Sequence, residues 1–262
     1  MSDRLKKVVK SVPLLHALLS SVAKRSYETK AWVLQRPLRH FCQNLPSIVS
    51  EPVFVKVGAN DGITGDPCSK LLLANEKWRG LLIEPVPYCF ERLKATFWDS
   101  RRFRCEPLAI GPFTGEATFF YVDAKAKQSI PGLPLWFDQL GSFDRKHITK
   151  HLNGVLEPFI NELKIPVCPL SDILVRDGIQ DVHLLHVDTE GYDYKVLKSL
   201  DFTKYLPLSI FIEHKHLPGD EKIEMMRLLL EHDYSVRNCG GDYFALRTQC
   251  YEKLQSTRAG KK

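Results

Sequence analysis

Short apolar runs alternate with longer amphipathic segments along most of the chain. The runs are rich in β-branched side chains and end at glycine, proline or acidic residues, as buried strands commonly do. An alternation of strands and helices indicates an α/β fold with a mostly parallel sheet. The predicted strands cover residues 53–57, 81–83, 103–110, 118–122, 182–187 and 208–212. The predicted helices cover residues 67–77, 87–98, 170–176, 192–199 and 221–232.

The last predicted elements are of a different kind. Residues 234–237 and 242–246 are two short strands that flank the turn Asn238-Cys239-Gly240-Gly241. Two strands joined by so short a glycine-containing turn form an antiparallel hairpin. We therefore expect one reversed strand at the C-terminal side of an otherwise parallel sheet.

The alternation is interrupted between residues 123 and 166. This segment contains several prolines, the pair Trp136-Phe137, and His147 and His151 at the helical spacing i, i+4. A long insertion in an α/β unit is often a lid or a binding element. We expect a domain over residues 46–250 that carries this insertion, a basic helical extension over 1–45, and a basic tail over 251–262.

The charge is unevenly distributed over the 262 residues. The net charge is +6, but residues 1–40 carry +7, residues 251–262 carry +3 and the remaining body carries −4. Nucleic-acid binding would be expected to place basic residues on the body as well, so no nucleic-acid partner is predicted. We interpret the basic ends first as solvated segments, and second as a peripheral contact of the N-terminus with an anionic membrane.

Seven scattered cysteines, none in a C-x-x-C pair, argue against a disulfide framework and a zinc site. Reduced thiols are typical of a cytoplasmic protein. Residues 11–23 weakly resemble a signal peptide, but Pro13 and His16 interrupt the apolar part. An amphipathic helix, packed on the domain or lying on a membrane surface, is the favoured interpretation, and no apolar run is long enough to span a bilayer.

The most specific chemistry lies at the ends of the first two strands. The first strand ends in Gly58-Ala59-Asn60-Asp61-Gly62, and the second ends in Glu84-Pro85. Ligands of open α/β sheets bind beyond the carboxyl ends of the strands, and glycines allow the backbone to approach them. A carboxylate that ends the second strand can accept hydrogen bonds from both hydroxyls of a ribose. These residues therefore predict a nucleoside site.

The spacing of the glycines distinguishes between two nucleoside cofactors. Dinucleotide folds use G-x-G-x-x-G, and here the middle glycine is missing between Gly58 and Gly62. Asp61 and Asp66 would repel a pyrophosphate, whereas they suit an ammonium group or the neighbourhood of a sulfonium. The site thus favours S-adenosylmethionine. A nicotinamide-dependent oxidoreductase and a non-catalytic adapter with the same fold are the alternatives.

Several motifs, in order, resemble those of the FkbM family of methyltransferases. The motifs are Phe54–Gly62 with Asp66-Pro67, Trp78–Pro87, Leu140-Gly141-Ser142-Phe143, Leu185–Asp193 with its D-x-E-G-x-D pattern, and Ile212-Glu213-His214. The resemblance covers roughly residues 50–246, and several motifs in order are more specific than any single one. It implies a class I, Rossmann-like methyltransferase that uses S-adenosylmethionine. Family members typically methylate hydroxyl oxygens of sugars and natural products.

The resemblance also suggests which residues bind the cofactor. Lys56 stands where many class I methyltransferases have an acidic residue, so Asp61 or Asp66 would have to hold the amino-acid end of the cofactor. Asn60 and Asp61 are alternatively only turn formers. The predicted cofactor-binding residues are Gly58, Asn60, Asp61, Gly62, Asp66, Glu84, Pro85, Ala109 and Asp188.

Asp188, Glu190 and His214 are the predicted catalytic residues. A hydroxyl acceptor must lose its proton, and the ordinary pKa of histidine suits that task, so His214 is expected to be the base. Glu190 or Asp188 would orient His214 or serve instead; helix capping is their alternative role. His214 and His216 could also bind a metal with the carboxylates, but no metal signature is present and no metal site is predicted. The expected acceptor is a small molecule or a glycan.

Overall fold

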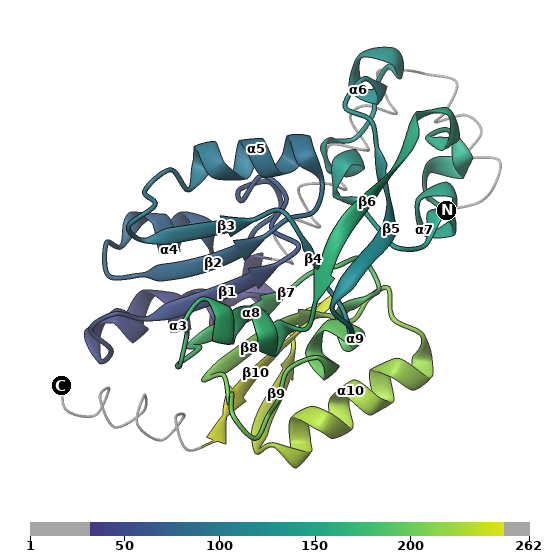
Figure 1. The fold of residues 1–262 in the computed structure, drawn as a ribbon. Coiled ribbons are helices and arrows are strands. Elements are labelled where there is room, and N and C mark those ends of the chain that lie inside the picture. The colour runs from purple at the N-terminus through teal and green to yellow at the C-terminus, as the bar shows by residue number, and fades with distance from the viewer. Residues whose placement is uncertain (1–31, 249–262) are drawn as a thin grey trace.

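The computed structural model describes residues 32–248, in which a seven-stranded sheet lies between two layers of helices (Figure 1). The strand order is β3-β2-β1-β7-β8-β10-β9. All neighbours pair in parallel except β10, which is antiparallel to β8 and to β9. The strands are β1 (Val53–Val57), β2 (Arg79–Ile83), β3 (Phe103–Glu106), β7 (Leu184–Val187), β8 (Ser209–Glu213), β9 (Tyr234–Asn238) and β10 (Asp242–Arg247).

The side chains of the central strands alternate between two buried cores. Val55 and Val57 of β1 belong to one apolar cluster, whereas Phe54 belongs to the other. Because successive side chains of a strand point to opposite faces, a strand that is buried on both faces must be apolar throughout. One cluster packs under α8 (Leu170–Arg176), α9 (Asp193–Lys198) and α10 (Gly219–Glu231), and the other under α3 (Arg36–Asn44), α4 (Ser69–Ala74) and α5 (Pro87–Thr96).

A second, smaller sheet carries the insertion. Its three strands lie in the order β4-β6-β5, with β5 and β6 antiparallel. In Figure 1, β5 and β6 extend away from the large sheet and hold the short helices of the insertion at their far end. These helices share a small apolar core of their own. The elements are β4 (Ala109–Ile110), β5 (Gly115–Val122), α6 (Ala126–Ser129), η2 (Leu135–Gln139), α7 (Arg145–Thr149), η3 (His151–Gly154), η4 (Glu157–Phe159) and β6 (Ile160–Cys168).

The predicted fold class is confirmed, including the single reversed strand at the C-terminal side. Two details differ from the prediction. The strand expected over 103–110 is divided into β3 and β4, which belong to different sheets, because Pro107 offers no backbone donor to a ladder. Strand β6 lies in and beyond the predicted insertion and was not expected as a strand.

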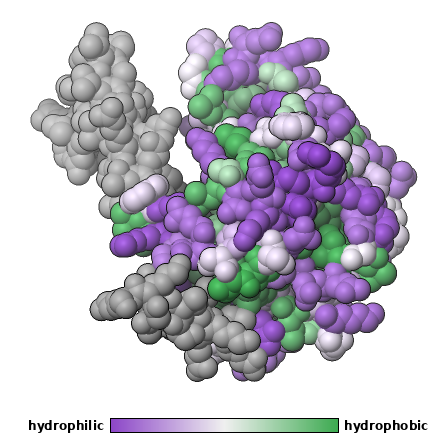
Figure 2. Space-filling view, turned by 90° about the vertical axis from the view of Figure 1, so that its left-hand side faces the viewer, coloured by the Kyte–Doolittle hydropathy of each residue, from purple (hydrophilic) through white to green (hydrophobic). Residues whose placement is uncertain are grey.

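Most of the two basic ends lies outside the described residues, so the predictions made for 1–31 and 249–262 are not addressed by the structure. Among residues 32–248, no helix has the length and apolar character that crossing a membrane requires. Figure 2 shows a mainly polar face on which hydrophobic residues form small groups. The six cysteines of the described part are all free thiols.

Candidate active site

The turn after β1 is shaped by close backbone contacts. The amides of Gly58 and Ala59 both donate to the carbonyl of Ile83 at 3.0 Å, which joins the ends of β1 and β2. Gly58 has a φ of +77°, and a Cβ there would lie 1.8 Å from the carbonyl oxygen of Asp188. No other residue fits this position, since both the backbone conformation and the neighbouring strand exclude a side chain.

Glu84 follows β2 and is held at the same edge of the sheet. Its two carboxylate oxygens accept hydrogen bonds from the backbone amides of Asn60 at 2.7 Å and Val86 at 2.9 Å. The side chain is buried, and burial raises the pKa of Glu84 to about 7, although both hydrogen bonds oppose the shift. Each oxygen keeps a lone pair, so the carboxylate can still accept hydrogen bonds from a ligand.

A pocket opens beside these residues, at the carboxyl ends of β1, β2 and β7. It comprises about 880 Å³ of space, part of which is open to solvent. Phe143 and Tyr192 form an aromatic part of the wall, with ring centroids 4.7 Å apart. The predicted site residues that line the pocket are Gly58, Asn60, Asp66, Glu84, Pro85, Ala109, Asp188 and Glu190.

Two predicted cofactor residues, Asp61 and Gly62, are not among those that line the pocket. The Asp61 carboxylate accepts hydrogen bonds from the amides of Ile63 and Thr64 and from the Thr64 hydroxyl. Gly62 lies against helix α5, and a Cβ there would be 2.6 Å from the ring of Phe97. These two residues shape the turn, which for Asp61 was the alternative drawn from the sequence.

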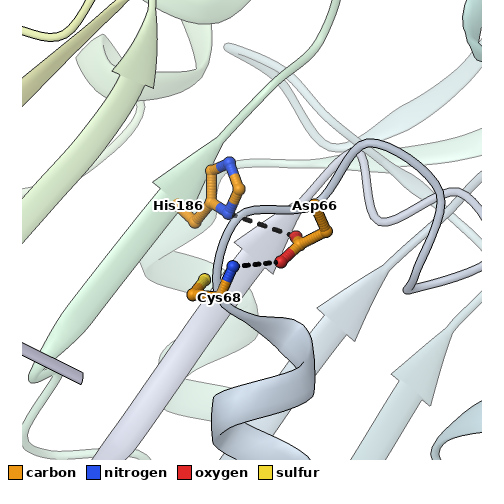
Figure 3. Close-up of side chains that lie close together, drawn as sticks. All are labelled: Asp66, Cys68 and His186. Carbon is orange, nitrogen blue, oxygen red and sulfur yellow. Dashed lines mark hydrogen bonds and ion pairs between the residues drawn. The ribbon is translucent and has the colours of Figure 1, made fainter. Parts of the chain in front are cut away.

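A buried group that we call the Asp66 cluster consists of Lys56, Asp66, Cys68 and His186, of which Lys56 and Asp66 line the pocket. Figure 3 shows Asp66, Cys68 and His186. Lys56 forms an ion pair with Asp66, and the amide of Cys68 donates to the same carboxylate at 2.8 Å. Burial alone would raise the pKa of Asp66, but the Lys56 charge together with hydrogen bonds from Lys56 and the Ser69 amide holds that pKa well below its usual value. Burial and the Lys56 charge lower the pKa of His186 to about 3, so this ring is neutral.

The turn after β7 places Asp188 and Glu190 at the pocket. The Asp193 carboxylate accepts from the amides of Thr189 at 2.9 Å and Gly191 at 3.0 Å, and Glu190 adopts a φ of +55°. Burial, and then the neighbouring Glu190, raise the pKa of Asp188 to about 7. Asp193 belongs to the recognised D-x-E-G-x-D pattern, but the sequence did not reveal that its role is to fold this turn.

Glu190 is surrounded by histidines from distant parts of the chain. Its Oε2 lies 3.3 Å from Nε2 of His147 and 3.3 Å from Nε2 of His216. His151 lies beside both, with ring centroids 5.0 Å from His147 and 5.8 Å from His216. We call these three histidines with Glu190 and Glu213 the Glu190 cluster. The insertion supplies two of its members to the edge of the large sheet.

The predicted base, His214, lies in another environment. Its ring stacks on Tyr243 of β10 at a centroid distance of 3.9 Å, and it is not among the residues that line the pocket. Its backbone amide donates to the carbonyl of Gly241, which draws the residue toward the hairpin. Of the two histidines that follow β8, His216 and not His214 contacts Glu190. The histidine pair was visible in the sequence, but its spacing does not say which ring faces the site.

The comparison with protein families gives one match of substantial length. The family described as methyltransferase FkbM domain matches residues 56–239. The chain therefore belongs to the FkbM methyltransferase family. This membership confirms the family predicted from the motifs, and S-adenosylmethionine follows as its cofactor.

The solved structures similar to this chain are distant. The methyltransferase FkbM from Methylobacillus flagellatus KT is 17% identical with a TM-score of 0.46, over 75% of this chain and 43% of that chain. The Aeropyrum pernix fibrillarin with natively bound S-adenosyl-L-methionine is 11% identical with a TM-score of 0.35, over 75% of this chain and 65% of that chain. This chain thus spans less than half of the Methylobacillus protein. None of the curated proteins matches the chain.

Proposed function

We propose that this chain transfers the methyl group of S-adenosylmethionine to a hydroxyl oxygen of a saccharide or a natural product. In this reaction the acceptor oxygen forms a bond to the methyl carbon while the sulfur–carbon bond breaks. S-adenosylhomocysteine leaves with the electron pair of the broken bond, and the hydroxyl proton passes to a base. The cofactor is already activated, so alignment of the two substrates is the main task of the protein.

The position of Glu84 is the observation that carries the proposal. A carboxylate that follows the second strand, lines the pocket and is held by two backbone amides is well suited to accept hydrogen bonds from ribose hydroxyls. The pocket also contains Ala109 and Pro85, whose small or flat apolar surfaces suit an adenine ring. Gly58 keeps the backbone close to the ligand at the same point.

The Asp66 cluster suits the amino-acid end of the cofactor. Lys56 and Asp66 both line the pocket, and their ion pair offers one charge of each sign to a zwitterion. The Lys56 ammonium would contact the cofactor carboxylate, and Asp66 or Asp188 would contact the cofactor amine. Many class I methyltransferases have an acidic residue at the position of Lys56. In this assignment Lys56 instead binds the carboxylate of the cofactor.

The acceptor end of the pocket contains Asp188 and Glu190. Either carboxylate could take the hydroxyl proton or orient the acceptor, since both are at the carboxyl end of β7. The aromatic side chains of Phe143 and Tyr192 offer flat surfaces of the kind against which sugar rings pack. These features support a hydroxyl-bearing acceptor of the saccharide type.

The proposal is tested by calorimetry and by a transfer assay. Binding of S-adenosylmethionine but not of NAD is expected, as is incorporation of labelled methyl groups into hydroxyl-bearing glycans during an acceptor screen. Tight cofactor binding without transfer to any hydroxyl acceptor, combined with transfer to an amine or a carbon centre, would overturn O-methylation. Failure to bind the cofactor at all would instead support the adapter alternative.

A further inference from the structure

Three histidines and two glutamates meet beside the acceptor end of the pocket. His147 is on α7 and His151 begins η3, both in the insertion, whereas His216 follows β8 of the large sheet. The ring centroids of His147 and His216 are 5.6 Å apart, although about seventy positions separate the two residues. Nothing in the established family assignment requires such a convergence.

The potential ligand atoms of the Glu190 cluster lie close together. One atom each from His147, His151 and Glu190 falls within 4.8 Å of the others, and the same holds for Glu190, Glu213 and His216. Glu190 belongs to both triads and joins them. Four ligands around a tetrahedral ion lie about 3.4 Å apart, so modest side-chain rotations would complete a shell.

Several of these atoms have no hydrogen-bond partner although they are buried. They are Nε2 of His147, Nε2 of His151, Oε2 of Glu190 and Oε2 of Glu213. The side chain of His147 is only 6% exposed. Buried polar groups are nearly always paired, so unpaired imidazole and carboxylate atoms that share a small volume are a candidate set of ligands.

Ion pairing alone explains the cluster less well than a metal ion does. The contacts of Glu190 with His147 and His216 at 3.3 Å leave Nε2 of His151 and Oε2 of Glu213 without a hydrogen-bond partner. Protonation of all three rings would place like charges within 6 Å of one another, which is unfavourable. Neutral imidazoles and a carboxylate can instead share one cation without repulsion.

We propose that His147, His151, His216 and Glu190 bind a divalent transition-metal ion, with Glu213 as a neighbouring or additional ligand. Imidazole-rich sites prefer zinc and related first-row ions, whereas Mg²⁺ and Ca²⁺ prefer shells made of oxygen. This site was not predicted from the sequence. The spacing of single histidines carries no metal signature until the insertion folds onto the sheet.

The metal site has a consequence for substrates that rests on the proposed function. Glu190 lines the pocket, so an ion bound to it lies next to the acceptor end. A cation there would lower the pKa of a coordinated acceptor hydroxyl and ease its deprotonation. The ion would also connect the insertion to the large sheet, because each supplies two of the four ligands.

The Asp66 cluster provides an internal contrast. Asp66, Cys68 and His186 also offer ligand atoms within 4.8 Å of one another. The Lys56 ammonium already neutralises Asp66 there, and a cation would have to displace it. We therefore expect no metal in the Asp66 cluster.

The experiment measures metal binding by the full chain, without an affinity tag and after treatment with a chelator. Titration with Zn²⁺ alone is expected to show one ion per chain with a Kd below about 1 μM. Replacement by Co²⁺ should give visible absorption bands of a low-coordinate site. Millimolar Mg²⁺ should not compete.

Three variants locate the ion. The double variant His147→Asn/His216→Asn and the nearly isosteric Glu190→Gln are expected to weaken Zn²⁺ binding at least about 100-fold. His232→Ala is the matched control, since His232 lies after α10 with its Nδ1 2.9 Å from the Leu228 carbonyl, and its affinity should equal that of the wild type. Circular dichroism checks folding, and Glu190→Gln keeps the test valid if the double variant does not fold.

Absence of stoichiometric Zn²⁺ binding by the wild type would overturn the proposal. Equal Zn²⁺ affinity in wild type and Glu190→Gln would show that the proposed ligands are wrong. Competition by Mg²⁺ at concentrations similar to those of Zn²⁺ would show that the proposed class of metal is wrong. Cofactor binding is measured in the same samples. A chain that binds S-adenosylmethionine but no zinc rejects only the metal site, and one that binds zinc but no cofactor rejects only the proposed function.

Discussion

Two histidine–carboxylate clusters lie at the same edge of the sheet, yet they differ in how their charges are balanced. In the Asp66 cluster, a lysine and backbone amides satisfy the buried carboxylate. In the Glu190 cluster, three imidazoles and two carboxylates meet without a lysine or arginine in the group, and several of their atoms have no hydrogen-bond partner. A cluster whose carboxylate is already paired with a lysine is suited to a zwitterionic ligand, although Nδ1 of His186 has no hydrogen-bond partner. A cluster whose carboxylates lack such a partner is better suited to a cation.

Because the two clusters balance their charges differently, substitutions in them should differ in their effect on the free energy of unfolding. The loss expected in the Asp66 cluster is the largest effect predicted here. Lys56→Ala leaves the buried Asp66 carboxylate without its partner and should lower the free energy of unfolding by about 3–5 kcal/mol. Glu190→Gln removes one of several neighbouring carboxylates and should change the metal-free stability by less than about 1 kcal/mol. Urea denaturation of the chelator-treated proteins measures both. Equal losses in the two variants would remove the distinction between the clusters.

The cofactor half of the pocket can be separated from the acceptor half by affinity. Glu84→Ala removes a charged acceptor of ribose hydrogen bonds and should weaken cofactor binding about 10- to 100-fold. Asp61→Asn should change the affinity less than about threefold, because the hydrogen bonds of the Asp61 carboxylate all lie within its turn. Calorimetry with S-adenosylmethionine checks both. An undiminished affinity in Glu84→Ala would contradict the ribose assignment.

The pKa of Glu84 predicts how cofactor affinity depends on pH. The charged groups that act on Glu84 are Asp138, which raises its pKa, and Lys56, which lowers it, while burial brings the value to about 7. The ionised carboxylate is the better acceptor, so affinity for S-adenosylhomocysteine should rise about tenfold from pH 6 to pH 8. Most of the change should fall near pH 7.

Asp188 also has a pKa of about 7 and lines the same pocket, so a control must isolate Glu84. Glu84→Gln should bind more weakly, and its affinity should vary much less between pH 6 and pH 8. A profile that is unchanged in Glu84→Gln would assign the titration to another group. Calorimetry over this pH range, in buffers of matched ionic strength, gives the comparison.

Substitutions of the two histidines after β8 test which of them takes part in methyl transfer. His214→Phe preserves the stacking on Tyr243 and should change methyl transfer less than about threefold, whereas the equivalent change at His216 removes a group beside Glu190. His216→Phe should lower the rate of transfer by at least about 100-fold. Turnover with a saturating acceptor measures both. A large loss in His214→Phe would restore the sequence-based prediction that His214 is the base.

Much of the fold follows from the local pattern of the chain. The apolar strands β1, β2, β7 and β8 and the terminal hairpin were predictable, because each is buried on both faces or is joined by a short glycine-containing turn. Strand β6 was not predictable in this way. It is mostly half-buried or exposed, carries charged side chains and includes Pro166, all of which count against a strand when the pairing partner is unknown.

Some residues of the candidate site were likewise predictable from the local pattern of the chain, and others were not. Local sequence was sufficient to place Glu84, Gly58 and Asp188 at the edge of the sheet where the pocket lies. Each follows directly on an apolar strand and must lie at its carboxyl end. It was not sufficient to show that Asp61 and His214 do not line the pocket, since the sequence does not reveal their contacts with Thr64 and Tyr243. The direction of a side chain in a turn depends on partners that the pattern does not specify.

The sequence by itself determined the succession of strands and helices of the large sheet, the glycine-bounded turn, the acidic end of the second strand and membership in a methyltransferase family. Only the tertiary structure brought His147 and His151 of the insertion to Glu190 and His216 of the sheet. The physical reason is distance along the chain. Hydrophobic periodicity acts over a few residues, whereas convergence of these groups depends on where the β5–β6 ribbon holds the helices of the insertion.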